Sequence, residues 1–163
     1  MAIAFGMNAT WEPQGPLVLP DAYQVRLTVD GKSYTQPLKL NMDPRVLVPK
    51  SDMEAEFALA SKLYRGLVQA GQALDEIAAF RLRANAADPQ KLKALEEIEP
   101  AGERTPGAGT GKPSLSSVRG ALAQLEVELD AADAAPTQQQ SAAAEKSLAE
   151  LDQLLRAWDS IKK

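Results

Sequence analysis

The chain has 163 residues, with 18 basic and 22 acidic side chains and neither histidine nor cysteine. This length allows one domain, or a small appendage joined to a helical bundle, and excludes two large domains. The net charge of −4 without a basic stripe argues against nucleic acid, and the missing residue types exclude disulfides, thiolate or imidazole metal sites and the usual nucleophile pairs.

No apolar run reaches the roughly 20 residues that a membrane span needs. Residues 1–11, MAIAFGMNATW, lack the basic segment and the long hydrophobic stretch of a secretory signal. We therefore expect no membrane span and no signal peptide in this chain. The sequence names no cofactor, and it leaves the compartment open.

The first periodic segment indicates a β-hairpin. Apolar residues alternate with polar ones at Tyr23, Val25, Leu27 and Val29, a pattern typical of a half-buried strand. Asp30-Gly31 predicts a two-residue turn that pairs Leu27 with Tyr34. Pro37 cannot donate to the ladder and is expected at an edge or a bulge. We expect residues 1–49 to form a small β element, in which residues 2–7 and 16–20 supply further short strands.

At Ser51 the period becomes helical, and Ser51 with Glu54 fits a capping box. Apolar or small residues then recur at spacings of four and three: Met53, Phe57, Ala60, Tyr64, Leu67, Gly71, Leu74 and Ala78. This single stripe predicts one long amphipathic helix buried along these positions. Tyr64 is accordingly expected in the core.

Three further helices are predicted. A short one begins at Asp88-Pro89 and ends at Ile98. Ser114 caps the next, and a capping box of Thr137 and Gln140 opens the last. The stripes of the last two helices comprise Leu115, Val118, Leu122, Leu125, Leu129 and Ala132, then Ala144, Leu148, Leu151, Leu155 and Trp158.

Residues 50–163 are therefore expected to form an antiparallel three-helix bundle, made of the long helix and a helical hairpin, with a short extra helix. Residues 99–113 are rich in glycine and proline and predict a flexible linker. The fold class is α+β and mainly α, with the β-hairpin at the N-terminal side of the bundle.

The stretch PGAGTGKPS, residues 106–114, resembles a phosphate-binding loop only superficially. Such a loop needs a first glycine five positions before the Gly-Lys pair and a hydroxyl directly after it. Pro106 and Pro113 occupy those two positions. The stretch is therefore interpreted as part of the linker.

Paired carboxylates, such as Asp75 with Glu76, are interpreted as charge on solvated helix faces. Asp43, Arg45 and Asp52 lie near the transition from strand to helix and are the nearest candidates for a ligand site. The same residues also fit a turn that is fixed by a side-chain hydrogen bond and an ion pair.

Residues 15–46, GPLVLPDAYQVRLTVDGKSYTQPLKLNMDPRV, resemble the segment that follows the β-propeller in large bacterial BNR-repeat proteins, which are often described as sialidase-like, sortilin-like or glycosyl-hydrolase-like. Residues 132–162 resemble the helical tail of the same proteins. The chain departs from them at Asp21-Ala22 and in its long Gly/Pro linker. The resemblance implies a C-terminal accessory module beside a propeller, extracytoplasmic in the parent family. It carries over no catalytic residue.

Two functional hypotheses follow. The first is a non-catalytic interaction module that docks on a propeller domain or on another copy of itself, because a small sheet leaves open edges. Its expected contact residues are Trp11, Tyr23, Val25, Leu27, Tyr34 and Leu38. The alternative is a small enzyme or ligand-binding protein that uses Asp43, Arg45 and Asp52.

Overall fold

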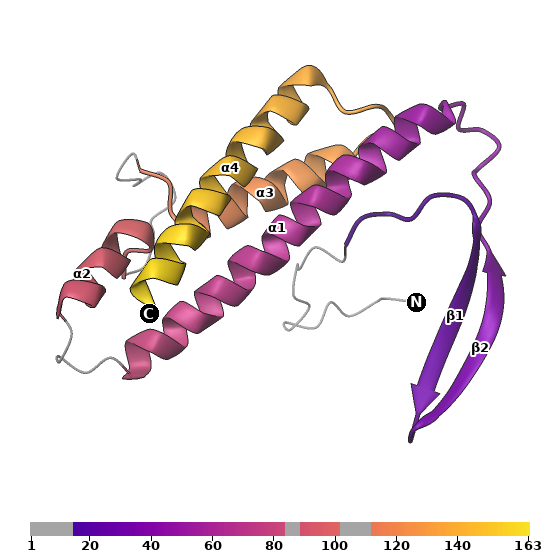
Figure 1. The fold of residues 1–163 in the computed structure, drawn as a ribbon. Helices are drawn as coiled ribbons and strands as arrows, with labels where there is room; N and C mark the ends of the chain where they lie inside the picture. Colours follow the sequence, from indigo (N-terminus) through magenta and orange to yellow (C-terminus); the bar gives the residue numbers. More distant parts are fainter. Residues whose placement is uncertain (1–14, 84–88, 102–111) are drawn as a thin grey trace, which may run out of the picture.

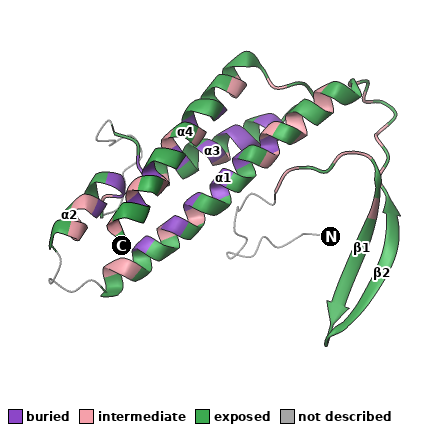
Figure 2. Cartoon of the chain, in the orientation of Figure 1, coloured by how far each residue is buried: buried purple, intermediate pink, exposed green. Residues whose placement is uncertain are grey.

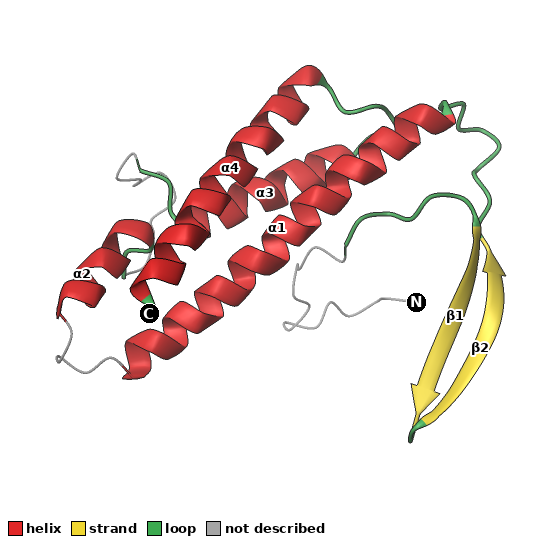
Figure 3. Ribbon diagram, in the orientation of Figure 1, coloured by secondary structure: helices red, strands yellow, loops and turns green. Residues whose placement is uncertain are grey.

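A β-hairpin begins the part of the chain that the computed structural model describes, which is residues 15–83, 89–101 and 112–163. Strand β1 (Ala22–Val29) pairs antiparallel with β2 (Lys32–Lys39), as Figure 3 shows in yellow. Asp30 has φ 48° and Gly31 has φ 76°, so both turn residues adopt the left-handed conformation that the tight turn needs. The predicted register is confirmed, with Leu27 opposite Tyr34.

Both faces of this hairpin are exposed, as the green ribbon in Figure 2 shows. The alternation in β1 had predicted a strand that is half-buried, so this prediction was wrong. No strand forms over residues 16–20, and residues 2–7 lie outside the described residues. The hairpin therefore has no third strand from residues 16–20, and none of the four described helices buries its apolar side.

Helix α1 (Lys50–Arg83) is longer than the predicted helix and begins one residue earlier. The backbone N–H groups of Asp52 and Met53 donate to the carbonyl oxygen of Pro49, at 3.0 and 3.3 Å. Ser51 thus lies inside the first turn, and its hydroxyl donates to Asp52 Oδ1 at 3.2 Å. The predicted capping box does not form, because the helix begins before its capping residue.

The buried face of α1 is rotated from the predicted one. Its buried positions are Ala60, Leu63, Gly66, Leu67, Ala70, Ala73 and Ile77. Leu63 is fully buried, whereas the neighbouring Tyr64 is 37% exposed, so the prediction of Tyr64 as a core residue was wrong. Small residues occupy much of the buried face because they let α3 and α4 approach closely.

The remaining helices are α2 (Pro89–Ile98), α3 (Leu115–Asp130) and α4 (Gln138–Ile161). Helices α1, α3 and α4 pack on one another, and α2 packs on α4 (Figure 1). The side-chain oxygens of Ser114 and Thr137 accept hydrogen bonds from the backbone of Ser117 and Gln140, which confirms both predicted caps. Asp88, the predicted cap of α2, lies outside the described residues. The mainly helical α+β fold is thereby confirmed.

The core lies along the seam where α1, α3 and α4 meet. Its most deeply buried side chains include Leu63, Leu122 and Leu151. Trp158, 3% exposed, stacks edge-on against Phe80 with ring centroids 5.6 Å apart. Its Nε1 donates to Glu76 Oε2 at 2.8 Å, which fastens the end of α4 to α1. Trp158 is thus a core residue, as expected.

The described ends of the 99–113 connection are held in place. Glu99 is buried, and its carboxylate accepts hydrogen bonds from the backbone N–H of Ser116, at 2.9 Å, and from the Ser116 hydroxyl. This carboxylate satisfies a free N–H group in the first turn of α3. Lys112 pairs with Glu97 at 3.0 Å. Residues 106–111, which hold most of the glycine-rich motif, lie outside the described residues.

Candidate functional site

One face of the hairpin carries almost all of its apolar side chains. Because successive residues of a strand point to opposite faces, β1 and β2 place one group of residues together: Tyr23, Val25, Leu27, Val29, Tyr34 and Leu38. We call these six residues the apolar face. Val25, Leu27, Val29, Tyr34 and Leu38 are each 42–61% exposed. Five of the six residues expected from the sequence therefore share this face.

The opposite face of the hairpin is polar. The Thr28 and Ser33 hydroxyls are 2.9 Å apart across the strands, and Arg26 and Lys39 also belong to this face. Pro37 lies opposite Gln24 on this face. Proline has no N–H group to donate to a neighbouring strand, but it is tolerated here because each strand of a two-stranded sheet is an edge strand. The hairpin is thus a ribbon with one apolar and one polar side.

Trp11, the sixth residue predicted for the interaction surface, lies outside the described residues. Tyr23 lies near the start of β1 and is half-buried. Its hydroxyl donates to the carbonyl oxygen of Leu19 at 2.6 Å. This bond fastens the root of the apolar face to the segment that precedes β1.

A pocket of about 320 Å³ lies at the root of the hairpin. Its walls come from residues 17–20, residues 40–42, the start of α1 and the end of α3. Met42, Met53 and Phe57 give it apolar sides. It also contains three carboxylates, from Glu56, Asp130 and Asp133. We call it the root pocket.

No basic side chain lines the root pocket among the described residues. Burial raises the pKa of Glu56, and the charges of Asp133 and Asp130 raise it further, against a backbone hydrogen bond from Ala134. Burial also raises the pKa of Asp130. The pocket is therefore a concentration of acidic groups, and no lysine or arginine from residues 15–83, 89–101 or 112–163 lines it.

Glu126 lies one helical turn before Asp130 on α3 and is 3% exposed. Neither of its carboxylate oxygens has a hydrogen-bond partner among the residues that the structure describes. Burial, followed by the charge of Asp130, raises the pKa of this carboxyl group. A charged group buried without a partner reduces stability, so Glu126 adds to the unfavourable acidity of this end of the bundle.

The residues proposed for a ligand site at the strand-to-helix junction do not line the root pocket. Arg45 Nη2 contacts Asp43 Oδ2 at 2.6 Å, and the backbone N–H of Arg45 donates to Asp43 Oδ1 at 2.9 Å. The Arg45 side chain thereby lowers the pKa of Asp43. In the described part of the chain, no hydrogen bond or ion pair joins Asp52 to either residue. The Asp43-Arg45 pair fixes a turn, as the second interpretation expected.

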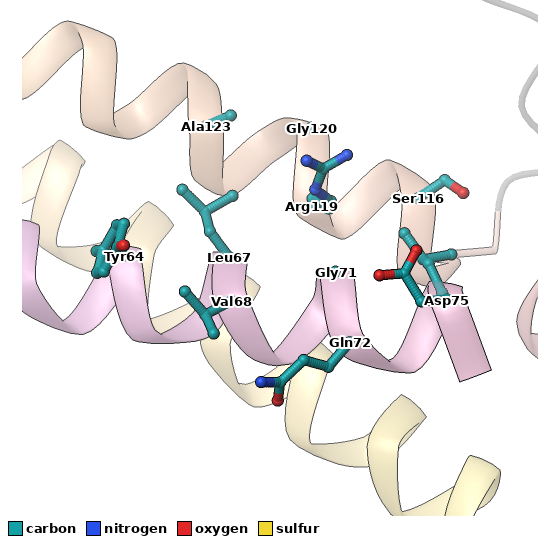
Figure 4. Close-up of a pocket in the computed structure, with 11 residues that line it drawn as sticks. Tyr64, Leu67, Val68, Gly71, Gln72, Asp75, Ser116, Arg119, Gly120 and Ala123 are labelled. Atoms are coloured by element: carbon teal, nitrogen blue, oxygen red, sulfur yellow. The ribbon is translucent and has the colours of Figure 1, made fainter. Parts of the chain in front are cut away.

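A second hollow, of about 580 Å³, runs between α1 and α3 (Figure 4). Tyr64 lies at one end and Asp75 at the other, and Arg119 lines the hollow from α3. A Cβ atom added at Gly71 or Gly120 would have no neighbouring atom within 4 Å, so there is open space beside both glycines in this hollow. Five of its lining residues are polar, and none of their interactions among the described residues identifies a ligand.

Within the described ranges, no three acidic side chains are arranged so that they could hold a metal ion. None of the helices described is both long and apolar enough to cross a membrane.

Comparison of the chain with protein-family models, with curated proteins and with solved structures finds no match. The likeness to the region that follows the propeller in BNR-repeat proteins therefore stays a prediction.

Sequence reasoning found the apolar face but missed the root pocket. Glu56 lies on α1, more than 70 positions before Asp130 at the end of α3 and Asp133 in the loop that follows. Each of them reads as ordinary surface charge on an amphipathic pattern. Only the packing of α1 against α3 brings them together.

Proposed function

We propose that this protein is a non-catalytic interaction module whose hairpin docks on another protein through the apolar face. The observation that carries the proposal is the exposure of this face next to a bundle that has closed its own core without it. A two-stranded hairpin is at best marginally stable in water unless its apolar side is covered. A partner surface would supply that cover.

The energetic terms favour a face-specific contact. Burying a large aliphatic or aromatic side chain contributes about 1.5–3 kcal/mol, so several such residues together can exceed the roughly 4–15 kcal/mol that association costs. The polar face offers no comparable gain. Both strand edges also present unpaired backbone groups, which gives a partner strand a second means of attachment.

The partner is expected to be a protein. The resemblance to BNR-repeat proteins supports a β-propeller domain of the parent architecture, beside which this module would stand. The exposed apolar face supports another copy of the chain equally well. In either case the module holds domains together and performs no bond-making chemistry.

Leu27→Asp is expected to abolish assembly, whether with a second copy or with a propeller domain, because it puts a charge at the centre of the apolar face. Mass in solution, measured by light scattering for the chain alone and mixed with a candidate propeller domain, reports the result. Helicity measured by circular dichroism should stay unchanged, since the hairpin packs on no helix of the core.

Thr28→Asp is the matched control, because Thr28 lies next to Leu27 in sequence but on the polar face. It should assemble as the unmodified chain does. Equal loss of assembly in both variants, or equal retention, would contradict docking through the apolar face.

A further inference from the structure

We propose that the occupant of the apolar face is a second copy of this chain, packed so that the hairpin tip of each copy, with Lys32, lies over the root pocket of the other. This inference rests on the proposed function and specifies its partner. It follows from where the charges of the hairpin and of the pocket lie.

The hairpin carries a basic group at its tip. Lys32 pairs with Val29 in the register, which places it at the tip on the same side as the apolar face. It is exposed and makes no ion pair within the described residues. From Ala22 to Lys39 the hairpin has three basic and one acidic side chain, a net charge of 3 − 1 = +2.

The root pocket carries the complementary charge. Its three carboxylates share the pocket with apolar side chains, and no basic residue of the described part of the chain lines it. A lysine suits such a pocket, because its methylene stem packs on apolar walls while the ammonium group meets the carboxylates. The pocket thus fits a basic side chain that arrives with apolar neighbours, as Lys32 does.

The root end of the apolar face adjoins the root pocket through Tyr23 and Leu19. Tyr23 belongs to the face, and its hydroxyl bonds to Leu19, which lines the pocket. Leu40 N donates to Asp21 O at 2.9 Å and extends the ladder to the pocket wall. Both strands of the hairpin therefore lead into the wall of the pocket at their root ends.

Lys32 cannot fill the pocket of its own chain. Strands of eight residues rise about 3.3 Å per residue, which puts the tip roughly 25 Å from the root. Figure 1 shows that the hairpin root lies near the start of α1 and that the hairpin tip points away from it. A Lys32 side chain that enters the pocket must therefore come from another molecule.

A twofold axis meets this requirement for both copies at once. When two hairpins lie antiparallel with their apolar faces together, each tip falls at the other's root, so one contact is made twice. The face of a two-stranded ribbon measures about 25 Å by 10 Å, an area of roughly 250 Å². This area is smaller than the roughly 800 Å² that each partner contributes to a stable interface. The pocket walls supply additional contact area.

Exchange of the charges tests this arrangement. Lys32→Glu alone should raise the dissociation constant of the dimer at least about tenfold, because a carboxylate then meets the acidic pocket. The double variant Asp130→Lys with Asp133→Lys should dissociate similarly, because Lys32 then meets lysines. Lysine is compatible with the end of α3, where the helix dipole favours a cation.

An equimolar mixture of the two variants should restore the dimer, because each tip then finds an oppositely charged pocket. Light scattering measures the mass, and a purification tag on one variant shows that the dimers are mixed. Lys39→Glu, on the polar face, is the control and should leave the unmodified dimer intact. Circular dichroism confirms that each variant is folded.

An unmodified chain that stays monomeric, or variants that do not restore the dimer on mixing, would overturn the inference. The proposed function is judged separately. A monomeric chain that binds a propeller domain through Leu27 but not Thr28 would leave the proposed function standing with a different partner, whereas loss of that selectivity would remove both.

Discussion

Gly66→Leu is expected to lower the free energy of unfolding by about 3 kcal/mol, the upper end of the range for overpacked cores. A Cβ atom at residue 66 would lie 2.9 Å from Leu148 Cδ2, 3.1 Å from Leu122 Cδ1 and 3.3 Å from Leu151 Cδ2. Leu122 lies on α3, and Leu148 and Leu151 lie on α4, so both helices contact this position. A larger side chain here must push α3 and α4 away from α1. Chemical denaturation followed by circular dichroism measures the change.

Gly71→Leu is the matched control on the same helix. Its added side chain enters open space between α1 and α3, and leucine favours a helix over glycine by up to about 1 kcal/mol. This variant should be as stable as the unmodified chain or slightly more stable. Equal stability of the two leucine variants would contradict the close packing at Gly66.

Glu126→Met is expected to raise the free energy of unfolding at neutral pH by about 1–3 kcal/mol, because it removes a buried carboxylate that has no hydrogen-bond partner in the described part of the chain. Methionine matches the length of glutamate and suits the apolar surroundings. Thermal or chemical denaturation of both proteins measures the gain. Glu128→Met, on the exposed side of α3, should change stability by no more than about 0.5 kcal/mol.

The gain from Glu126→Met should depend on pH. Because folding raises the pKa of Glu126, the folded state binds more protons than the unfolded state between the ordinary and the raised pKa. The stability of the unmodified chain therefore falls as the pH rises through this window. The advantage of methionine should shrink as the pH is lowered toward the ordinary glutamate pKa, and a constant advantage would contradict a titrating Glu126.

Local signals in the sequence predicted the hairpin register and two helix caps. Asp30-Gly31 admits few backbone conformations, and both residues adopt the left-handed one that was expected. Ser114 and Thr137 each precede a strongly periodic segment, so their roles follow from neighbours within three residues. These features depend on short-range chemistry, which a sequence displays directly.

The buried side of α1 could not be predicted in the same way. Two adjacent stripes share Ala60 and Leu67, and the larger side chains of one of them, including Phe57 and Tyr64, favoured the wrong choice. Packing selected the other stripe because its glycine and alanine positions allow two helices to approach. That preference depends on partners and is not visible in the helix alone.

The exposure of the hairpin and the burial of Glu126 also depend on tertiary structure. Alternation shows that one side of β1 is apolar, but it does not show whether the same chain covers that side. Glu126 looks like one charge among several on α3, and only the assembled bundle encloses it. The candidate site was therefore predictable as a face and unpredictable as a face joined to an acidic pocket.

Hydrogen–deuterium exchange of the hairpin amides at increasing chain concentration tests most directly whether a partner covers the apolar face. We predict fast exchange over residues 22–39 in the dilute chain and marked slowing on assembly, while amides around Leu122 in the core exchange at an unchanged rate. Hairpin amides that are already as protected as the core in the dilute chain, or that exchange equally fast at every concentration, would contradict it.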